Sequence, residues 1–154
     1  MKSTLISIIL GLSAGLSLVH ADEASDFLKL VPLPDGIVFE IVEADEDKLA
    51  ELLPRVKQII ATVRQQHPEV EFAVVSHGRE EFALQTSNQD EYSEIHDNVI
   101  ALVADDVPVY VCETHAGWYG VTAEDFPEYV NVAPTGPGQI SLYEELGFYL
   151  IVIE

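Results

Sequence analysis

The residue best suited to covalent chemistry is Cys112, the only cysteine in a chain of 154 residues. It follows the apolar run 107–111, which predicts a buried strand, so the thiol lies at the carboxyl end of that strand. In open α/β sheets, ligands bind just outside the carboxyl ends of the strands. A thiol in such a position can act as a nucleophile when it ionises, although a free thiol has a pKa of ~8.5.

Two histidines are candidates to assist this thiol. His115 follows Cys112 by three residues, so in a helical turn its ring can face the sulfur, and a protonated imidazole would stabilise a thiolate. His77 follows another predicted strand and is the second candidate at the same sheet edge. The nearby Glu113 and the acidic composition oppose the thiolate. The predicted catalytic residues are Cys112, His115 and His77.

Other roles for the cysteine stay open. A single cysteine excludes an internal disulfide and leaves an intermolecular bridge, a reactive thiol, a metal ligand or a buried core sulfur. Thiolate and imidazole suit copper or zinc, and the candidate ligands are Cys112, His115, His77 and His96. The chain lacks closely spaced ligand motifs such as Cys-x2-Cys, so neither a metal nor another cofactor is predicted.

Strands and helices alternate along the rest of the chain. Strands are predicted at 37–42, 70–76, 107–111, 129–133 and 148–153, and helices at 48–66, 79–86, 90–104 and 139–146. Residues 22–35 are predicted as a polar lead-in and 134–138 as a turn. Pro54 either marks the first turn of the long helix or kinks it. The strand runs are apolar throughout, which indicates a sheet covered on both faces.

This pattern predicts one domain, residues 22–154, with an α/β fold. The expected architecture is a three-layer α/β/α sandwich around a mostly parallel sheet of about five strands. No nucleotide-binding glycine motif or serine-hydrolase elbow is present.

Residues 1–21 have the features of a secretory signal peptide. Lys2 is followed by an apolar stretch that ends in the small-x-small pattern 19–21, which predicts cleavage after Ala21. The apolar stretch is short for a membrane span and lacks a basic flank after it. The mature protein is therefore expected in the periplasm or outside the cell, without a membrane anchor.

The chain is strongly acidic, with a formal charge of −20. Residues 1–21 contain one lysine and no acidic residue, so cleavage makes the charge one unit more negative. Such a surface repels phosphate backbones and anionic headgroups, which argues against nucleic acid and membrane partners.

Five segments together resemble the DsrE/DsrF-like (YchN-like) family. These are Val-Val-Ser-His-Gly at 74–78, Val-Tyr-Val-Cys at 109–112, the acidic turn 120–125, Val-Ala-Pro-Thr-Gly at 132–136 and Gly-Phe-Tyr-Leu-Ile at 147–151. The order and spacing of these segments carry the resemblance, which covers nearly all of the mature chain.

The resemblance implies a three-layer α/β/α fold and homo-oligomers, either trimers or hexamers. It also implies sulfur handling through the strand-end cysteine, here Cys112, with a sulfur donor or acceptor protein or a small sulfur species as partner. The expected function is that of an exported persulfide carrier, similar to a sulfurtransferase, and not of a conventional turnover enzyme. The alternative is a non-catalytic oligomeric binding module in which Cys112 is structural or binds a soft metal.

Overall fold

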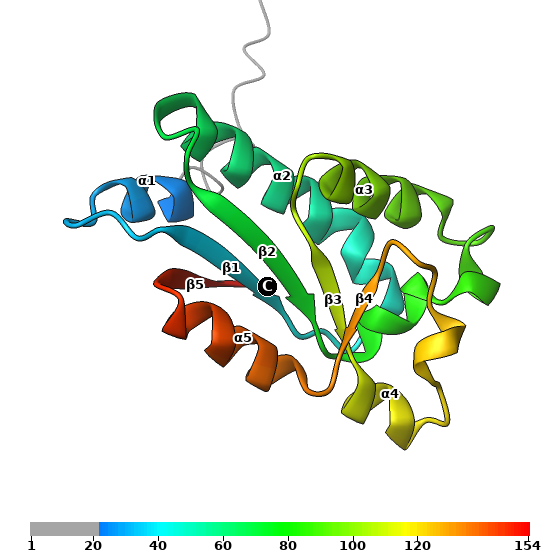
Figure 1. The fold of residues 1–154 in the computed structure, drawn as a ribbon. Helices are drawn as coiled ribbons and strands as arrows, with labels where there is room; N and C mark the ends of the chain where they lie inside the picture. The colour runs from blue at the N-terminus through cyan, green and yellow to red at the C-terminus, as the bar shows by residue number, and fades with distance from the viewer. Residues whose placement is uncertain (1–21) are drawn as a thin grey trace, which may run out of the picture.

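The sheet has five strands, all parallel, in the order β4-β3-β2-β1-β5 (Figure 1). The computed structural model describes residues 22–154, so the predicted signal peptide lies outside the described residues. The strands are β1 (Gly36–Ile41), β2 (Glu71–Ser76), β3 (Val109–Cys112), β4 (Asn131–Ala133) and β5 (Phe148–Ile153). The predicted α/β fold with a five-stranded parallel sheet is confirmed.

Helices cover both faces of this sheet. The helices are α1 (Asp22–Leu28), α2 (Leu49–Gln66), α3 (Ser93–Ala104), α4 (Glu113–Trp118) and α5 (Gly136–Glu145). In Figure 1, α2 and α3 lie over one face and α5 lies over the other. Short 3-10 segments lie between them: η1 (Glu46–Lys48), η2 (Arg79–Leu84), η3 (Thr86–Asn88) and η4 (Ala123–Asp125).

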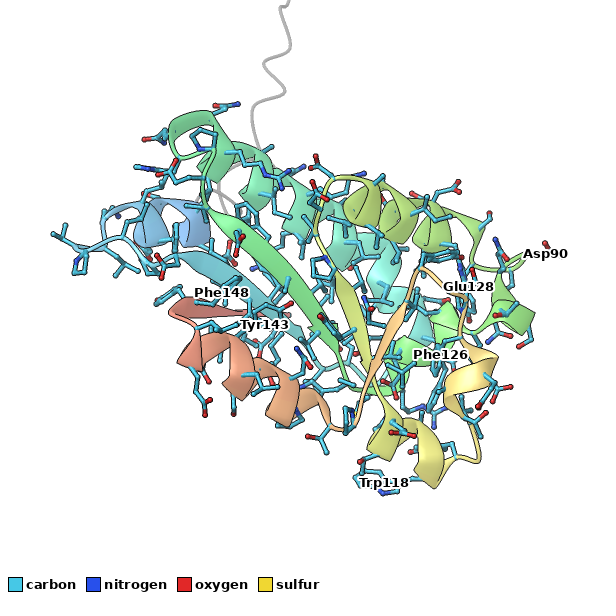
Figure 2. The ribbon with its side chains drawn as sticks, in the orientation of Figure 1. Asp90, Trp118, Phe126, Glu128, Tyr143 and Phe148 are labelled. Carbon is cyan, nitrogen blue, oxygen red and sulfur yellow. The ribbon has the colours of Figure 1, made fainter. Side chains whose placement is uncertain are left out.

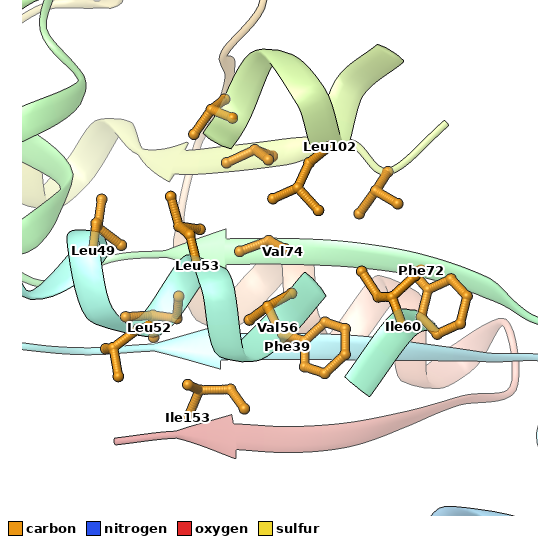
Figure 3. Close-up of a cluster of buried hydrophobic side chains, with 14 of the residues drawn as sticks. Phe39, Leu49, Leu52, Leu53, Val56, Ile60, Phe72, Val74, Leu102 and Ile153 are labelled. Carbon is orange, nitrogen blue, oxygen red and sulfur yellow. The ribbon is translucent and has the colours of Figure 1, made fainter. Parts of the chain in front are cut away.

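The main hydrophobic core lies between the sheet and α2. The residues of α2 predicted to form its apolar face are all buried: Leu49, Leu52, Leu53, Val56, Ile59, Ile60 and Val63. They pack against strand residues that include Phe39 and Val74 (Figure 3). Fully burying one such side chain contributes roughly 1.5–3 kcal/mol. The opposite face has a smaller cluster of Val38, Ala73, Val75 and Ile140 under α5.

The amino-terminal helix corrects one sequence prediction. Residues 22–35 do not form a lead-in throughout, because residues 22–28 form α1. Ala24 and Phe27 are buried in the main core, and the Phe27 ring lies 6.0 Å from that of Tyr149. Glu23 pairs with Arg55 of α2. A seven-residue helix is unstable alone, so the contacts with α2 and β5 stabilise it. The apolar spacing within so short a segment is too weak to predict a helix.

Several predicted element boundaries also shift, and one of the two alternatives for Pro54 is decided. Helix α5 begins at Gly136, so the predicted turn at 134–138 is partly helical: the Thr135 hydroxyl accepts the Gly138 N–H at 3.1 Å. Proline is favourable in a first helical turn because its missing N–H would lack a partner there. Pro54 lies inside α2 and not at its start. Strand β3 includes Cys112 as its last residue.

Candidate functional site at the carboxyl end of the sheet

Cys112 joins the end of β3 to the start of α4. It is the N-cap of α4, and its Sγ accepts the backbone N–H of His115 at 3.3 Å. The side chain is buried, with 4% of the residue exposed. The sulfur therefore ends β3 and caps α4 from a nearly enclosed position.

Glu81 of η2 is the second member of the site, and its carboxylate contacts both ends of the first turn of α4. Its Oε2 accepts the backbone N–H of Cys112 at 2.8 Å, and its Oε1 lies 2.7 Å from His115 Nδ1. The residue is 0% exposed. Burial raises the pKa of Glu81 above its ordinary value, and the hydrogen bonds from Cys112 and His115 offset only part of that rise. We call Cys112, His115 and Glu81 the thiol site.

The His115 ring lies among aromatic side chains. It stacks on Phe82 at 5.4 Å with an interplanar angle of 20°, and Trp118 and Tyr119 lie at 5.6 and 5.3 Å. Trp118 is 75% exposed and projects outward from α4 (Figure 2). The Arg79 guanidinium lies over the Tyr119 ring at 5.6 Å. The thiol site thus has an aromatic wall that reaches the surface of the molecule.

The neighbouring Glu80 is also 0% exposed, but it has a different set of partners. Its carboxylate accepts the Ser76 hydroxyl at 2.8 Å, the Gly78 N–H at 2.9 Å and the Glu43 N–H at 2.7 Å. A Cβ at residue 78 would collide with this carboxylate and with the backbone of Glu43, so the close approach requires glycine. Glu80 therefore ties the ends of β1 and β2 to η2.

His77 does not share the hydrogen bonds of the thiol site. Its Nε2 lies 2.8 Å from Oε1 of Glu40 in β1, and its side chain packs against Gly136 at the start of α5. Within residues 22–154 it makes no hydrogen bond to Cys112 or His115. Of the three predicted catalytic residues, Cys112 contacts His115 through the backbone N–H of His115, and His77 lies in a separate pair with the carboxylate of Glu40.

His96 is a buried structural residue. Its Nε2 donates to the Ala83 carbonyl at 3.0 Å, and its Nδ1 accepts the Tyr129 hydroxyl at 2.6 Å. Both ring nitrogens are therefore used. Across the described part of the chain, no three His, Cys, Asp or Glu side chains are grouped to hold a metal ion.

The two buried glutamates are the site residues that the sequence analysis missed. Residues 79–86 are predicted only as a short helix, whereas residues 80–84 are all buried in a 3-10 helix. One signal was present: the acidic pair 80–81 directly precedes the apolar run 82–84 and begins three residues after the strand-end His77. Charged side chains that are buried together with an adjacent apolar run must find specific partners.

A sizeable cavity lies at the other end of the sheet. It has a volume of about 460 Å³ and is lined in part by Glu71, Tyr143 and Phe148. Tyr143 and Phe148 lie far from Trp118 of α4 in the view of Figure 2. Cys112 is not among the residues that line this cavity.

Two solved structures are similar to this chain over most of its length. MTH1491 from Methanobacterium thermoautotrophicum, described as a protein of unknown function, is 26% identical with a TM-score of 0.62, and the match covers 75% of this chain and 96% of MTH1491. The YchN protein of E. coli is 16% identical with a TM-score of 0.56, and the match covers 76% of this chain and 98% of YchN. No protein-family profile and no curated protein sequence matches the chain.

Proposed function

We propose that this chain, which has the DsrE/YchN-like fold, is a sulfur-binding and sulfur-transfer protein that carries persulfide on Cys112. The observation that supports it best is the environment of the sulfur. Sγ lies at the carboxyl end of a strand and accepts the backbone N–H of His115 at 3.3 Å. That bond would stabilise the thiolate, which is the reactive form of cysteine.

The proposed reaction is an exchange at sulfur. The Cys112 thiol gives up its proton, and the thiolate attacks the sulfane sulfur of a polysulfide or persulfide donor. A new S–S bond forms on Sγ and the donor's S–S bond breaks; a persulfide donor leaves as a thiolate and a polysulfide donor leaves as a shortened polysulfide anion. The reverse exchange passes the sulfur to an acceptor thiol. No external oxidant or reductant is needed, because the sulfane sulfur keeps the same oxidation state when it passes from the donor to Sγ.

The burial of Cys112 supports a second candidate function. A residue that is 4% exposed can be a core sulfur in a non-catalytic oligomeric binding module of the same fold. The two functions differ in one respect: a sulfur carrier must admit a donor to Sγ, whereas a structural cysteine need not react while the protein is folded.

Export is part of the proposal. The sequence pattern of residues 1–21 supports cleavage after Ala21 and a periplasmic or secreted protein. Among residues 22–154, no helix is long and apolar enough to cross a membrane. N-terminal sequencing of the exported protein should begin at Asp22; a chain that still begins at Met1 would exclude this part of the proposal.

Self-association into a trimer or hexamer is also proposed. Several large apolar side chains are exposed at α5 and β5, including Leu142 in α5, Leu146 at its C-cap and Val152 in β5. Exposed apolar groups that lie on adjacent elements are typical of contact surfaces. Light scattering coupled to gel filtration would give the mass in solution, and a monomer at all concentrations would exclude this proposal.

Mass spectrometry tests the sulfur-carrier function directly. Purified protein is incubated with polysulfide, freed of excess reagent and weighed intact. The wild type should gain mass in steps of one sulfur atom, and the Cys112→Ser variant should gain none. A wild type that gains no sulfur while folded, but whose thiol reacts after unfolding, would instead support the structural role of Cys112.

A further inference from the structure

The hydrogen-bond partners of the Glu81 carboxylate differ in kind from those of the Glu80 carboxylate. Glu80 accepts two backbone N–H groups and a hydroxyl, all near the ends of β1 and β2. Glu81 bridges two groups of one helical turn, the Cys112 N–H and the His115 ring. Both residues are equally buried, so burial alone does not explain why Glu81 meets an imidazole.

The hydrogen-bond chemistry at Glu81 favours one arrangement of protons. The Cys112 amide can only donate, so Oε2 must accept. The contact between Oε1 and His115 Nδ1 has two forms: a carboxylate accepting Nδ1–H, or a carboxylic acid donating to a bare Nδ1. The amide bond to Oε2 stabilises the carboxylate, which favours the first form.

The other ring nitrogen of His115 has a different environment. Nε2 makes no hydrogen bond to residues 22–154, and it is not among the buried polar atoms that lack a partner. It is therefore not fully buried, in a side chain that is 14% exposed beside the aromatic wall formed by Phe82, Trp118 and Tyr119. If Nδ1 carries the proton, Nε2 presents a lone pair there.

We infer that Glu81 is a positioning residue of the thiol site: it holds His115 in the Nδ1–H form and ties the first turn of α4 to Cys112. This inference rests on the proposed function for its purpose, although not for its test. In this form Nε2 keeps a free lone pair, which can take up a proton released at the thiol site. Glu81 then faces the imidazolium and balances its charge, as a carboxylate does for a general-base histidine.

In the isosteric variant Glu81→Gln, we expect the proton of neutral His115 to lie on Nε2 instead of Nδ1. The carbonyl oxygen of the new amide would still accept the Cys112 N–H, and the amide NH2 would then face His115 Nδ1 as a donor. His115 would move its proton to Nε2. A carboxylate-to-amide change therefore reverses the tautomer while it keeps the shape of the side chain.

Nitrogen-15 NMR of the histidine ring, on the whole protein without any sulfur compound, tests the inference. The wild type should show neutral His115 protonated at Nδ1. Glu81→Gln should show it protonated at Nε2. The exposed Glu113→Gln variant removes an equal charge from the same turn and should match the wild type.

Two outcomes overturn the inference. One is a wild-type His115 that carries its proton on Nε2, which requires no variant to observe. The other is a Glu81→Gln spectrum that is indistinguishable from that of the wild type. Neither outcome depends on persulfide formation, which the mass measurement on Cys112 tests separately. Failure of the sulfur-carrier function and failure of the Glu81 role are thus distinguishable.

Discussion

At the amino-terminal end of the strands, Glu69 and Glu71 are exposed beside an open cavity of about 460 Å³, whereas at the carboxyl-terminal end Glu80 and Glu81 are fully enclosed. The pKa of Glu69 is lowered, first by its backbone hydrogen bond and then by His67, while burial raises the pKa of Glu81. The difference shows that this cavity and the enclosed carboxylates lie at opposite ends of the strands.

This contrast has an energetic basis. A solvated carboxylate costs the fold little, but enclosing one costs several kcal/mol unless hydrogen bonds compensate. The chain bears that cost twice within two adjacent residues, next to its only thiol. Perturbed, enclosed ionisable groups cluster at functional sites, so the carboxyl-terminal end is the better candidate although the cavity is elsewhere.

The largest expected effect is the loss of Glu80. Glu80→Ala would leave the Ser76 hydroxyl and the Gly78 and Glu43 amides without their acceptor. The free energy of unfolding should fall by about 3 kcal/mol or more, since each buried donor left unsatisfied costs roughly 1–3 kcal/mol. Urea denaturation measures it. Glu71→Ala at the cavity is the control and should change stability by less than about 0.5 kcal/mol; equal losses would contradict the contrast.

Removal of a histidine ring should have the next largest effect. His115→Ala leaves Oε1 of the buried Glu81 without a partner and should lower the free energy of unfolding by about 2 kcal/mol. The matched control is His67→Ala, because His67 Nδ1 also lies near a carboxylate, that of Glu69 at 3.1 Å, but in solvent. Its expected loss is below about 0.5 kcal/mol.

The same variant bears on the thiol. Without the ring, the Glu81 carboxylate loses its hydrogen bond to Nδ1 and faces Cys112 without that partner, which disfavours a thiolate. The pH midpoint of iodoacetamide labelling should therefore move upward in His115→Ala. Superimposable profiles would mean that His115 does not influence the thiol. Labelling of neither protein before unfolding would assign Cys112 to the core.

The two ends should also differ in the sign of their pH dependence. Because the pKa of Glu81 is raised in the folded protein, the folded state binds this proton more tightly, and stability from Glu81 is lost as pH rises above its ordinary value of 4.5. Glu81→Gln should thus gain stability relative to the wild type as pH rises from acid to neutral.

Glu69 provides the opposite case. Its lowered pKa contributes stability above the ordinary value of 4.5 that is lost as pH falls. Relative to the wild type, Glu69→Gln should therefore become less stable as pH rises, by a small amount because the group is exposed. Thermal melts of both variants across this range measure the two slopes. Slopes of the same sign would show that the two environments do not differ as described.

Salt should have the smallest effect. With a formal charge of −20, self-repulsion among exposed groups opposes the compact state at low ionic strength. The melting temperature should rise by about a few degrees between millimolar and several hundred millimolar salt. The loss caused by His115→Ala should stay constant over this range, because enclosed pairs are screened much less. A melting temperature that does not change with salt would mean that the acidic groups are too dispersed to repel one another.

Sequence reasoning predicted the features that depend on residues close together in the chain and missed those that depend on distant contacts. The five strands and the apolar face of α2 were predictable, because each depends on a periodicity within one segment. Helix α1 was not, because a seven-residue helix is stabilised by Phe27 and Glu23 contacts with distant elements. Near the thiol, too, the local neighbours were predictable and the distant partners were not.

The sequence by itself determined that Cys112 ends a strand and that His115 follows one turn later, since both facts depend on residues close together in the chain. Only the tertiary structure decided the partners of the two side chains. Glu81 is 31 residues from Cys112 and 34 from His115, and η2 folds it beneath α4. Likewise His77 bonds to Glu40, 37 residues away, and not to the thiol. A buried charge takes whichever partner the packing of the elements places beside it, because leaving it unpaired costs more than any local preference supplies.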